Sequence, residues 1–511
     1  MQSSLPDSSP PPAGIWHRSL ERWQSTTDGR RALTLGIFCA AMFVLVNWRG
    51  YHQDVVPLAF APVSMIRYGT VSLEPFRPYY DGLVAENPNA DRWAWSESNG
   101  RLYSEKSMFV SMLAVPFYLP PVLAGVPTDD YRVWIAWGRL VAAALTGLTV
   151  SLVYLTLRRR GEVVSSTAFA LLFAFGTCVW TIIGQTLYDH EAVLFVAVVA
   201  WLLHDFPLPP GRIFLAALAA GAAVVLRPCT VVLLFPLGLY LLIPGRLAGW
   251  RGYLAAFAGI LPFPLLMALA NTLVFGAWYS TGYPPSQYRG SWRALWPEGA
   301  AGLLIAPNSG LFIQSPFLLL AVVGAWVAWG RSAPVSDRGL LRAYSLCFVS
   351  YWALFAKWHD WQGGLTFTSR MLSEGYPLWM PLVMVGWNHL RRFGWALRAT
   401  AIAGAWSFLY ELVNITTFDR TNPLNAPHLP WTVQDHFFVV HWRVFGAAET
   451  LRSVLIGRTW PWEPDSQHGV APPSILLFTI CAVFLVVALR AMVTPAASEA
   501  QPDGKMPAAA P

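Results

Sequence analysis

Residues 48–69 read WRGYHQDVVPLAFAPVSMIRYG and form the first polar stretch after the first long apolar segment. Asp54 follows the end of that segment by about one helical turn, so we expect its carboxylate at a membrane surface. Residues 55–73 predict an amphipathic helix that lies along this surface and covers Asp54. A loop aspartate is more often simply solvated, but a carboxylate held in this place could accept a proton from a hydroxyl group.

The composition is that of a polytopic membrane protein. Hydrophobic residues make up 55% of the 511-residue chain and charged residues only 12%. The net charge of +7 comes from basic residues scattered among apolar segments, a pattern that does not favour nucleic-acid binding. The five cysteines all fall in apolar runs without paired or metal-ligand spacing, so we expect neither a disulfide framework nor a zinc site.

The distribution of arginine orients the predicted segments in the bilayer. Arginines before the first apolar run place the N-terminus in the cytoplasm, so the loop that follows this run faces outwards. The apolar run 107–125 contains three prolines, and counting it as a span would place Arg158–Arg160 outside. We therefore expect a helix at the outer interface there, and the short basic loops then all fall on the cytoplasmic side.

The predicted fold is an all-α polytopic membrane protein, a bundle of about twelve transmembrane helices with an extracytoplasmic first loop that carries interfacial helices. The predicted spans lie near residues 32–48, 132–157, 164–184, 190–205, 213–227, 229–243, 252–276, 311–330, 343–357, 371–388, 396–414 and 473–491. Two of them, 213–227 and 229–243, are short for a bilayer core of about 30 Å. We expect them to form a hairpin of half-length helices joined at Arg227 and Pro228.

The expected domain organisation is one membrane domain between two disordered cytoplasmic ends. The boundaries are residues 1–31 for the N-terminus, 32–390 for the main membrane domain with its outer loop 49–131, 391–492 for the C-terminal spans with an outer loop 415–471, and 493–511 for the tail.

The turn between two predicted spans contains Asp189, His190 and Glu191. A turn between helices is naturally polar, but three adjacent ionisable residues in so short a connection also suit a functional site. Their oxygen atoms would suit a hard divalent cation, although three consecutive side chains do not point one way. We assign no metal ligand here and leave a divalent cation open as a cofactor.

Arg139 and Arg227 are embedded in apolar sequence. Ionisable groups in membrane segments are costly unless they face a partner or a wet cavity, so each is expected in a structural ion pair or at a bound anion. Phosphate is the anion that a bilayer supplies in lipid form, and the guanidinium fork suits it.

The turn 357–377, KWHDWQGGLTFTSRMLSEGYP, contains Trp361, Gly363, Gly364 and Arg370 at the outer end of two spans. The glycine pair allows close backbone approach, and a tryptophan offers a flat face for a sugar or an anchor in the interface. Interfacial anchoring would explain the tryptophan but not the glycine pair or Arg370.

The order of several segments resembles the GT-C superfamily. These are membrane glycosyltransferases that use a polyprenyl-phosphate sugar, such as protein mannosyltransferases and the lipid A aminoarabinose transferase. The likeness covers roughly residues 32–390. After the first span and an outer loop that opens with an aspartate, the matching segments are YSEKSMFVSMLAVPFYL (103–119), TCVWTIIGQTLYDHEAVLF (177–195), VVLRPCTVVLLFPL (224–237), GLLIAPNSGLFIQSPFLLL (302–320) and WQGGLTFTSRMLSEGYPLWMPLV (361–383).

The resemblance implies that Asp54 is the catalytic base of the first outer loop. It implies that Asp189 and Glu191 lie where these enzymes place a second acidic site residue. The residues expected to contact the lipid-linked phosphate are Lys106, Arg227 and Arg370. The other residues that we expect at the substrate are Arg139, His190, Trp361, Gly363 and Gly364. Some members have a second acid directly after the first, where this chain has Val55.

The expected function is transfer of a sugar from a polyprenyl-phosphate donor to a hydroxyl of a glycan, lipid or protein acceptor. We expect the site on the extracytoplasmic side of a bacterial inner membrane. The alternative is a transporter or flippase of a lipid-linked or anionic substrate, because such proteins also use intramembrane arginines and interrupted helices. A non-catalytic lipid-binding subunit is a third reading. The clustering of polar residues on one face favours the enzyme.

Overall fold

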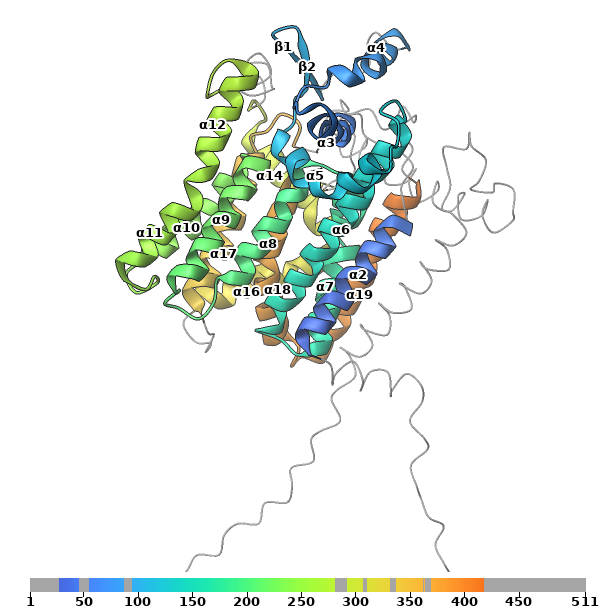
Figure 1. Cartoon of the computed structure of the whole chain (residues 1–511). Coiled ribbons are helices and arrows are strands. Elements are labelled where there is room, and N and C mark those ends of the chain that lie inside the picture. Colours follow the sequence, from blue (N-terminus) through green and yellow to red (C-terminus); the bar gives the residue numbers. More distant parts are fainter. Residues whose placement is uncertain are drawn as a thin grey trace, which may run out of the picture.

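The computed structural model describes residues 27–45, 55–86, 94–280, 292–306, 310–330, 337–361, 363 and 369–417. Helices dominate these ranges and lie side by side in a bundle, with a small layer of short elements at one end (Figure 1). Asp54, Gly364, residues 418–471 of the predicted last outer loop and the predicted last span lie outside the described residues.

The first helix, α2 (Asp28–Leu45), packs along the longest helix, α6 (Tyr131–Arg158). The two helices approach closely because glycines meet at the crossing. A Cβ atom added to Gly36 would lie 2.7 Å from the carbonyl oxygen of Gly147. The hydroxyl of Ser151 donates a hydrogen bond to the carbonyl of Ala32 at 2.8 Å. The predicted first span is thus a helix that joins the bundle through small residues.

The layer at the end of the bundle comes from the predicted first outer loop (Figure 1). Its elements are α3 (Val56–Tyr68), η2 (Glu74–Phe76), α4 (Arg77–Glu86), β1 (Trp95–Ser98), β2 (Arg101–Ser104) and α5 (Met108–Leu123). The two strands form an antiparallel hairpin in which Trp95 faces Ser104. Helix α3 packs against α5, and Phe60 of α3 stacks on Phe76 of η2 with ring centroids 4.3 Å apart.

The predicted helix after Asp54 is present as α3, but its surroundings differ from the prediction. Every residue from Val56 to Ser64 is buried, so this half of α3 is enclosed rather than amphipathic. The reason is that α5, α6 and η2 cover it together, which the local pattern of apolar residues does not reveal. Helix α3 is therefore part of the core of the layer.

The predicted span 164–184 is broken in the structure. Helix α7 (Val163–Phe175) ends, and a π-helical turn, η3 (Val179–Ile183), follows. At the break the carbonyl of Gly176 accepts a hydrogen bond from the hydroxyl of Ser315 at 2.7 Å. The chain then makes a short 3-10 helix, η4 (Asp189–Glu191), and continues as α8 (Ala192–Leu202).

The predicted pair of short helices corresponds to α9 (Pro210–Leu226) and α10 (Thr230–Leu242). They join at Arg227 and Pro228, but they do not pack as an isolated hairpin. Helix α9 packs against α8 and α11 (Gly249–Ile260), whereas α10 packs mainly against α17 (Arg338–Phe355). The predicted joint is therefore present, and each of the two helices packs mainly against other helices of the bundle.

The second half of the bundle is built from helices that follow α12 (Pro262–Phe275). They are α14 (Trp296–Ile305), α15 (Leu311–Gln314), η5 (Pro316–Leu318), α16 (Leu319–Trp329), α17, η6 (Arg370–Gly375), α18 (Tyr376–Leu390) and α19 (Gly394–Thr417). Helices α16 and α18 touch backbone to backbone. A Cβ atom on Gly324 would lie 1.9 Å from the carbonyl oxygen of Leu382.

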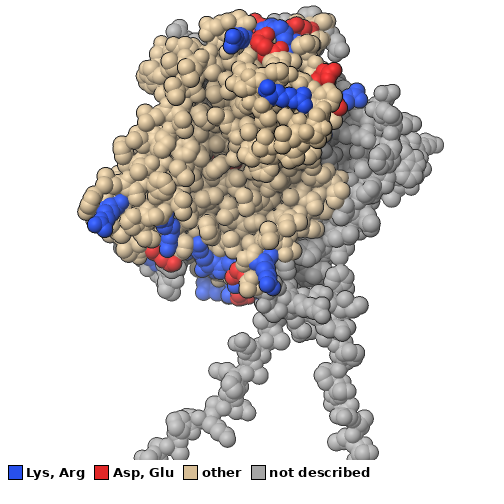
Figure 2. All heavy atoms as spheres, viewed as in Figure 1, with Lys and Arg blue, Asp and Glu red and all other residues tan. Residues whose placement is uncertain are grey.

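The surface supports the prediction of a membrane protein. Charged side chains gather at the two ends of the face in Figure 2, and the band between them is apolar or uncharged. Two stretches, Tyr131–Arg158 and Gly249–Phe275, are long and apolar enough to cross a membrane. The second exposes Leu265 by 60% and Leu273 by 74%, which fits contact with lipid better than contact with water. The number of twelve spans stays a prediction.

Candidate functional site

Arg227 lies at the joint between α9 and α10. Its backbone is extended, with φ −142° and ψ 98°, because Pro228 follows and disfavours a helical conformation at the residue before it. The residue is only 7% exposed. Its guanidinium group reaches η4 and η6, two short 3-10 turns that precede α8 and α18.

The guanidinium group of Arg227 lies between two carboxylates. Its Nη1 atom is 3.2 Å from Oδ1 of Asp189, and its Nε atom is 3.2 Å from Oε1 of Glu374. Both acids come from turns that are distant in sequence from Arg227. A buried cation is tolerated because opposite charges surround it, so this arrangement satisfies the requirement set by its apolar surroundings.

His190 connects the same two groups. Its Nδ1 atom lies 2.5 Å from Oε1 of Glu374, and its Nε2 atom lies 3.0 Å from Nη1 of Arg227. Nη1 of Arg227 also lies 2.9 Å from Nδ1, so the guanidinium group lies against the ring between its two nitrogens, and Nδ1 donates to the carboxylate when it carries the proton. The ring is 1% exposed. His190 is therefore a fixed part of the cluster.

Glu374 is fully enclosed, and its second oxygen has its own donor. The hydroxyl of Tyr351 on α17 donates to Oε2 of Glu374 at 2.9 Å, and the Sγ atom of Cys229 lies 3.3 Å from that hydroxyl. The cluster thus joins four parts of the chain, namely η4, the α9–α10 joint, α17 and η6. We call Asp189, His190, Arg227, Tyr351 and Glu374 the Arg227 cluster.

Asp189 is the more accessible of the two acids that pair with Arg227. Its side chain is 17% exposed, whereas that of Glu374 is 0% exposed. A carboxylate that keeps one side open could meet a substrate, while an enclosed one can only hold its neighbours in place. The cluster therefore has an accessible edge formed by Asp189 and a closed base formed by Glu374.

Two further cations border the cluster at Tyr188. The ring of Tyr188 stacks on that of His190 with centroids 4.9 Å apart. The Nζ atom of Lys106 lies 6.0 Å from the centroid of Tyr188, and the guanidinium carbon of Arg370 lies 5.7 Å from it. Both side chains are partly exposed. This edge of the cluster is positively charged.

The segment that carries Lys106 is fixed to the helix that carries Arg227. The hydroxyl of Ser107 donates a hydrogen bond to the carbonyl of Val225 at 2.6 Å. It also accepts one from the N–H of Phe109 at 3.3 Å and so caps the start of α5. Because Ser107 follows Lys106, this contact holds Lys106 close to the end of α9.

The structure brings five of the predicted site residues together. Asp189, His190 and Arg227 are in contact within the cluster, and Lys106 and Arg370 share Tyr188 beside it. The three segments that supply the cations are far apart in sequence. Their convergence is what the prediction of an anion site requires.

The other predicted residues take different places. Glu191 is fully buried, and within the described part of the chain neither of its carboxylate oxygens has a hydrogen-bond partner. Arg139 is partly buried on α6. Trp361 is 2% exposed and packs on Gly302, where a Cβ atom would lie 2.3 Å from its ring. Gly363 has φ +90°, a conformation that favours glycine, and its N–H donates to the carbonyl of Asp360 at 3.0 Å.

Glu374, Tyr188 and Tyr351 are members or neighbours of the cluster that the sequence analysis did not single out. Glu374 stands in SEGYPLW, a lone acid at the start of an apolar run, which is the same signal that identified Arg227. Tyr188 precedes Asp189 directly. Tyr351 carries no signal of its own, because a tyrosine in an apolar helix most often serves as a core residue.

The described residues contain no group of three or more histidine, cysteine, aspartate or glutamate side chains that could hold a metal ion. The acids of the cluster pair with Arg227 instead, and Glu191 stands apart from them.

The chain resembles a solved structure, although the comparisons of its sequence find no match. No protein-family model matches the chain, and a search of curated proteins finds no match. Among solved structures, the chain is similar to ArnT from Cupriavidus metallidurans bound to undecaprenyl phosphate, with a TM-score of 0.48 and 14% sequence identity over 91% of this chain and 77% of that chain. That protein is a lipid A aminoarabinose transferase, one of the enzymes that the sequence resembles.

Proposed function

We propose that this protein is a membrane glycosyltransferase that moves a sugar from a polyprenyl-phosphate donor to an acceptor hydroxyl at the extracytoplasmic face. The observation that carries the proposal is the edge of the Arg227 cluster. There Lys106 and Arg370 flank Tyr188 beside an accessible carboxylate, Asp189. Cations at an accessible edge suit a reaction in which a phosphate leaves, and the carboxylate of Asp189 can accept a hydrogen bond from the substrate there.

The proposed binding mode places the donor phosphate against Lys106 and Arg370. These two residues lie at the partly exposed edge, whereas Arg227 is enclosed and already has two carboxylate partners. Arg227 then acts by holding Asp189 in place and by adding positive charge behind the phosphate. The prenyl chain extends into the bilayer, and the sugar faces the layer formed by α3 and the hairpin.

The proposed reaction is a displacement at the anomeric carbon. The acceptor oxygen forms a bond to this carbon, and the bond from the carbon to the phosphate oxygen breaks. The phosphate leaves with the electron pair, and the positive edge stabilises its charge. Asp54 takes the proton of the acceptor hydroxyl, as the resemblance implies. In the sequence, Asp54 precedes by two positions Val56, the residue at which α3 begins.

The assignment is tested with purified protein and a labelled polyprenyl-phosphate sugar. Wild type should release the sugar from the lipid and transfer it to an acceptor. Asp54→Asn should abolish transfer, because an amide cannot take the proton, while expression and thermal stability stay unchanged. Full activity in this variant would refute the role of Asp54.

The same material separates the enzyme from its two rivals. A flippase would move the intact labelled lipid across vesicles without cleaving it, and a non-catalytic subunit would bind the lipid and leave it unchanged. Either result with wild-type protein, across a panel of sugars and acceptors, would contradict the proposal of a glycosyltransferase.

A further inference from the structure

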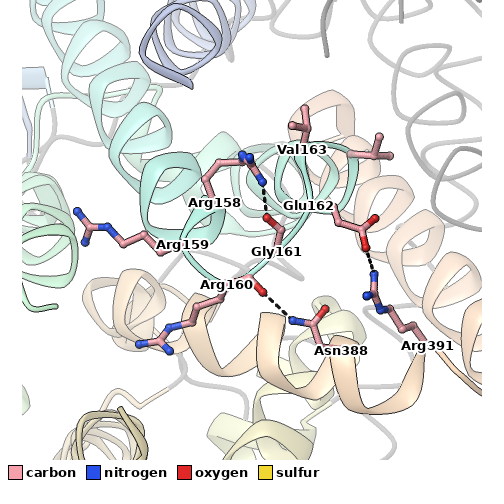
Figure 3. Close-up of a pocket in the computed structure, with 9 residues that line it drawn as sticks. Arg158, Arg159, Arg160, Gly161, Glu162, Val163, Asn388 and Arg391 are labelled. Atoms are coloured by element: carbon pink, nitrogen blue, oxygen red, sulfur yellow. Dashed lines mark hydrogen bonds and ion pairs between the residues drawn. The ribbon is translucent and has the colours of Figure 1, made fainter. Parts of the chain in front are cut away.

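A basic cavity lies at the opposite end of α8 from the Arg227 cluster. His190 precedes the first turn of α8, whereas Arg159 donates a hydrogen bond to the carbonyl of Trp201 at its last turn. The cavity has a volume of about 620 Å³ and lies between the α6–α7 turn and the end of α18 (Figure 3). Its charged lining consists of Arg158, Arg159, Arg160, Arg391 and one acid, Glu162. Two acids outside the lining, Asp28 and Asp337, pair with Arg158 and Arg160, so the excess of positive charge is confined to the wall of the cavity.

Arg158 and Arg391 are held in place by contacts that use only some of their donors. Nη1 of Arg391 lies 2.5 Å from Oε1 of Glu162. Nε of Arg158 donates to Asp28 at 2.9 Å, and its Nη1 donates to the carbonyl of Gly161. A guanidinium group has five N–H donors, so these contacts orient each group and leave others for an anion.

The backbone adds further donors to the same cavity. Helix α7 begins at Val163, and the first N–H that bonds back within it is that of Ser166, to the carbonyl of Glu162 at 2.9 Å. The N–H groups of the first turn thus have no carbonyl partner within the helix. Val163 and Val164 also line the cavity. A helix start beside arginines favours an anion, and the valines favour one that carries apolar groups.

The charges near Arg159 also favour a bound anion. Burial lowers the pKa of Arg159, and the neighbouring guanidinium groups of Arg212 and Arg160 lower it further, against the opposing effect of Tyr344 and Asp205. An anion placed among these groups would stabilise their charged forms. The geometry of the cavity and its charge therefore both favour a bound anion.

We propose that this cavity binds the phosphate of an anionic phospholipid headgroup at the cytoplasmic surface. A lipid is favoured over a soluble phosphate because the cavity opens at an end of the bundle where exposed charges border the apolar band (Figure 2) and because valines lie beside its arginines. The bound lipid would link the α6–α7 turn to α18. The inference does not depend on the reaction proposed above.

The test uses two substitutions that break the same ion pair with opposite effects on charge. Purified full-length protein in neutral detergent is titrated with phosphatidylglycerol, with phosphatidylcholine of equal chain length, and with inorganic phosphate, and native mass spectrometry gives the dissociation constant of the first bound molecule. Arg391→Gln should weaken phosphatidylglycerol binding by about tenfold, because one charged donor is lost. Glu162→Gln should strengthen it. Arg251→Gln, at the start of α11 and outside the cavity, should leave it unchanged.

Three outcomes would overturn the proposal. Equal weakening by Arg391→Gln and Glu162→Gln would show that the ion pair serves the structure alone. A similar loss in Arg251→Gln would show a general effect of surface charge. Inorganic phosphate that binds as tightly as phosphatidylglycerol, with the same response to the variants, would show a site for soluble phosphate. Tighter binding of phosphatidylglycerol than of the other two probes, with the opposite responses of the two cavity variants, would support the lipid.

Discussion

Glu374 shows how one enclosed carboxylate can hold a charged cluster together. It meets Arg227, His190 and Tyr351 at once and is 0% exposed. Glu374→Gln removes the negative charge and leaves Arg227 partly uncompensated, so we expect a loss of about 3–5 kcal/mol in the free energy of unfolding. Thermal unfolding in detergent measures this loss of stability.

The matched comparison for Glu374 is a surface pair. Glu162, with a side chain 68% exposed, pairs with Arg391 at 2.5 Å. Glu162→Gln should cost less than about 1 kcal/mol, because water screens an exposed pair. Equal losses in the two variants would mean that the Arg227 cluster contributes no more than a surface ion pair.

Lys106 and Asp189 should differ in which kinetic constant they control. If Lys106 binds the donor phosphate, Lys106→Gln should raise KM for the polyprenyl-phosphate sugar by about tenfold, and Lys106→Arg should restore most of it. Asp189→Asn should instead lower kcat by about a hundredfold, because it alters the accessible edge of the cluster. Steady-state kinetics with the labelled donor separate the two effects. A fall in kcat alone for Lys106→Gln would contradict its placement at the phosphate.

The sequence predicts several residues of the Arg227 cluster but not their arrangement. Arg227 is a charged residue in apolar sequence, and Asp189 and His190 belong to three adjacent ionisable residues in a short turn. That Arg227 lies between Asp189 and Glu374 could not be predicted, because the contact joins turns far apart in the chain. For Trp361, the sequence context suggests one role and the packing shows another environment. A tryptophan in a polar turn suggests a sugar platform, yet its ring is packed against Gly302.

At the scale of elements, Glu74 ties the layer that covers the site. Its Oε1 atom accepts from the N–H of Leu102 at 2.6 Å, so η2 is fixed to the hairpin. The side-chain hydrogen bonds from Arg77 hold the pKa of Glu74 below its ordinary value of 4.5. This contribution to stability is fully present above about pH 4.5 and is lost as the pH falls through the lower pKa of the folded state.

The expected outcome is a layer that loosens in acid before the bundle does. Hydrogen exchange of the β1–β2 hairpin should accelerate as the pH falls below about 4.5, after correction for the intrinsic rate. In Glu74→Gln this additional acceleration should be absent. An identical pH profile in wild type and variant would show that Glu74 does not hold the hairpin.

The contact between α16 and α18 gives a second prediction for elements. Gly324→Ala would place a methyl group 1.9 Å from the carbonyl oxygen of Leu382, so the helices must separate. We expect a loss of about 1–3 kcal/mol in the free energy of unfolding. Gly238→Ala on α10 meets nothing within 4 Å and should be neutral or slightly stabilising, because alanine favours a helix. Thermal unfolding of both variants tests the contrast.

At the scale of the whole molecule, the helical bundle follows from composition, but its internal breaks do not. Apolar runs predicted α6 and the α11–α12 stretch well, because length and hydropathy decide them. The same rule treated residues 164–184 as one span, whereas the chain divides into α7 and η3. The hydroxyl of Ser315 bonds to Gly176 at this break, a partner that lies outside any local window.

The shortness of α8 has a consequence for the depth of the reaction. The helix has 11 residues and so spans about 16 Å, roughly half the thickness of a bilayer core. It runs from the Arg227 cluster to the arginines of the opposite end. In the orientation proposed here, the cluster is therefore recessed below the outer headgroups. An acceptor must then offer its hydroxyl on a slender arm that reaches to this depth.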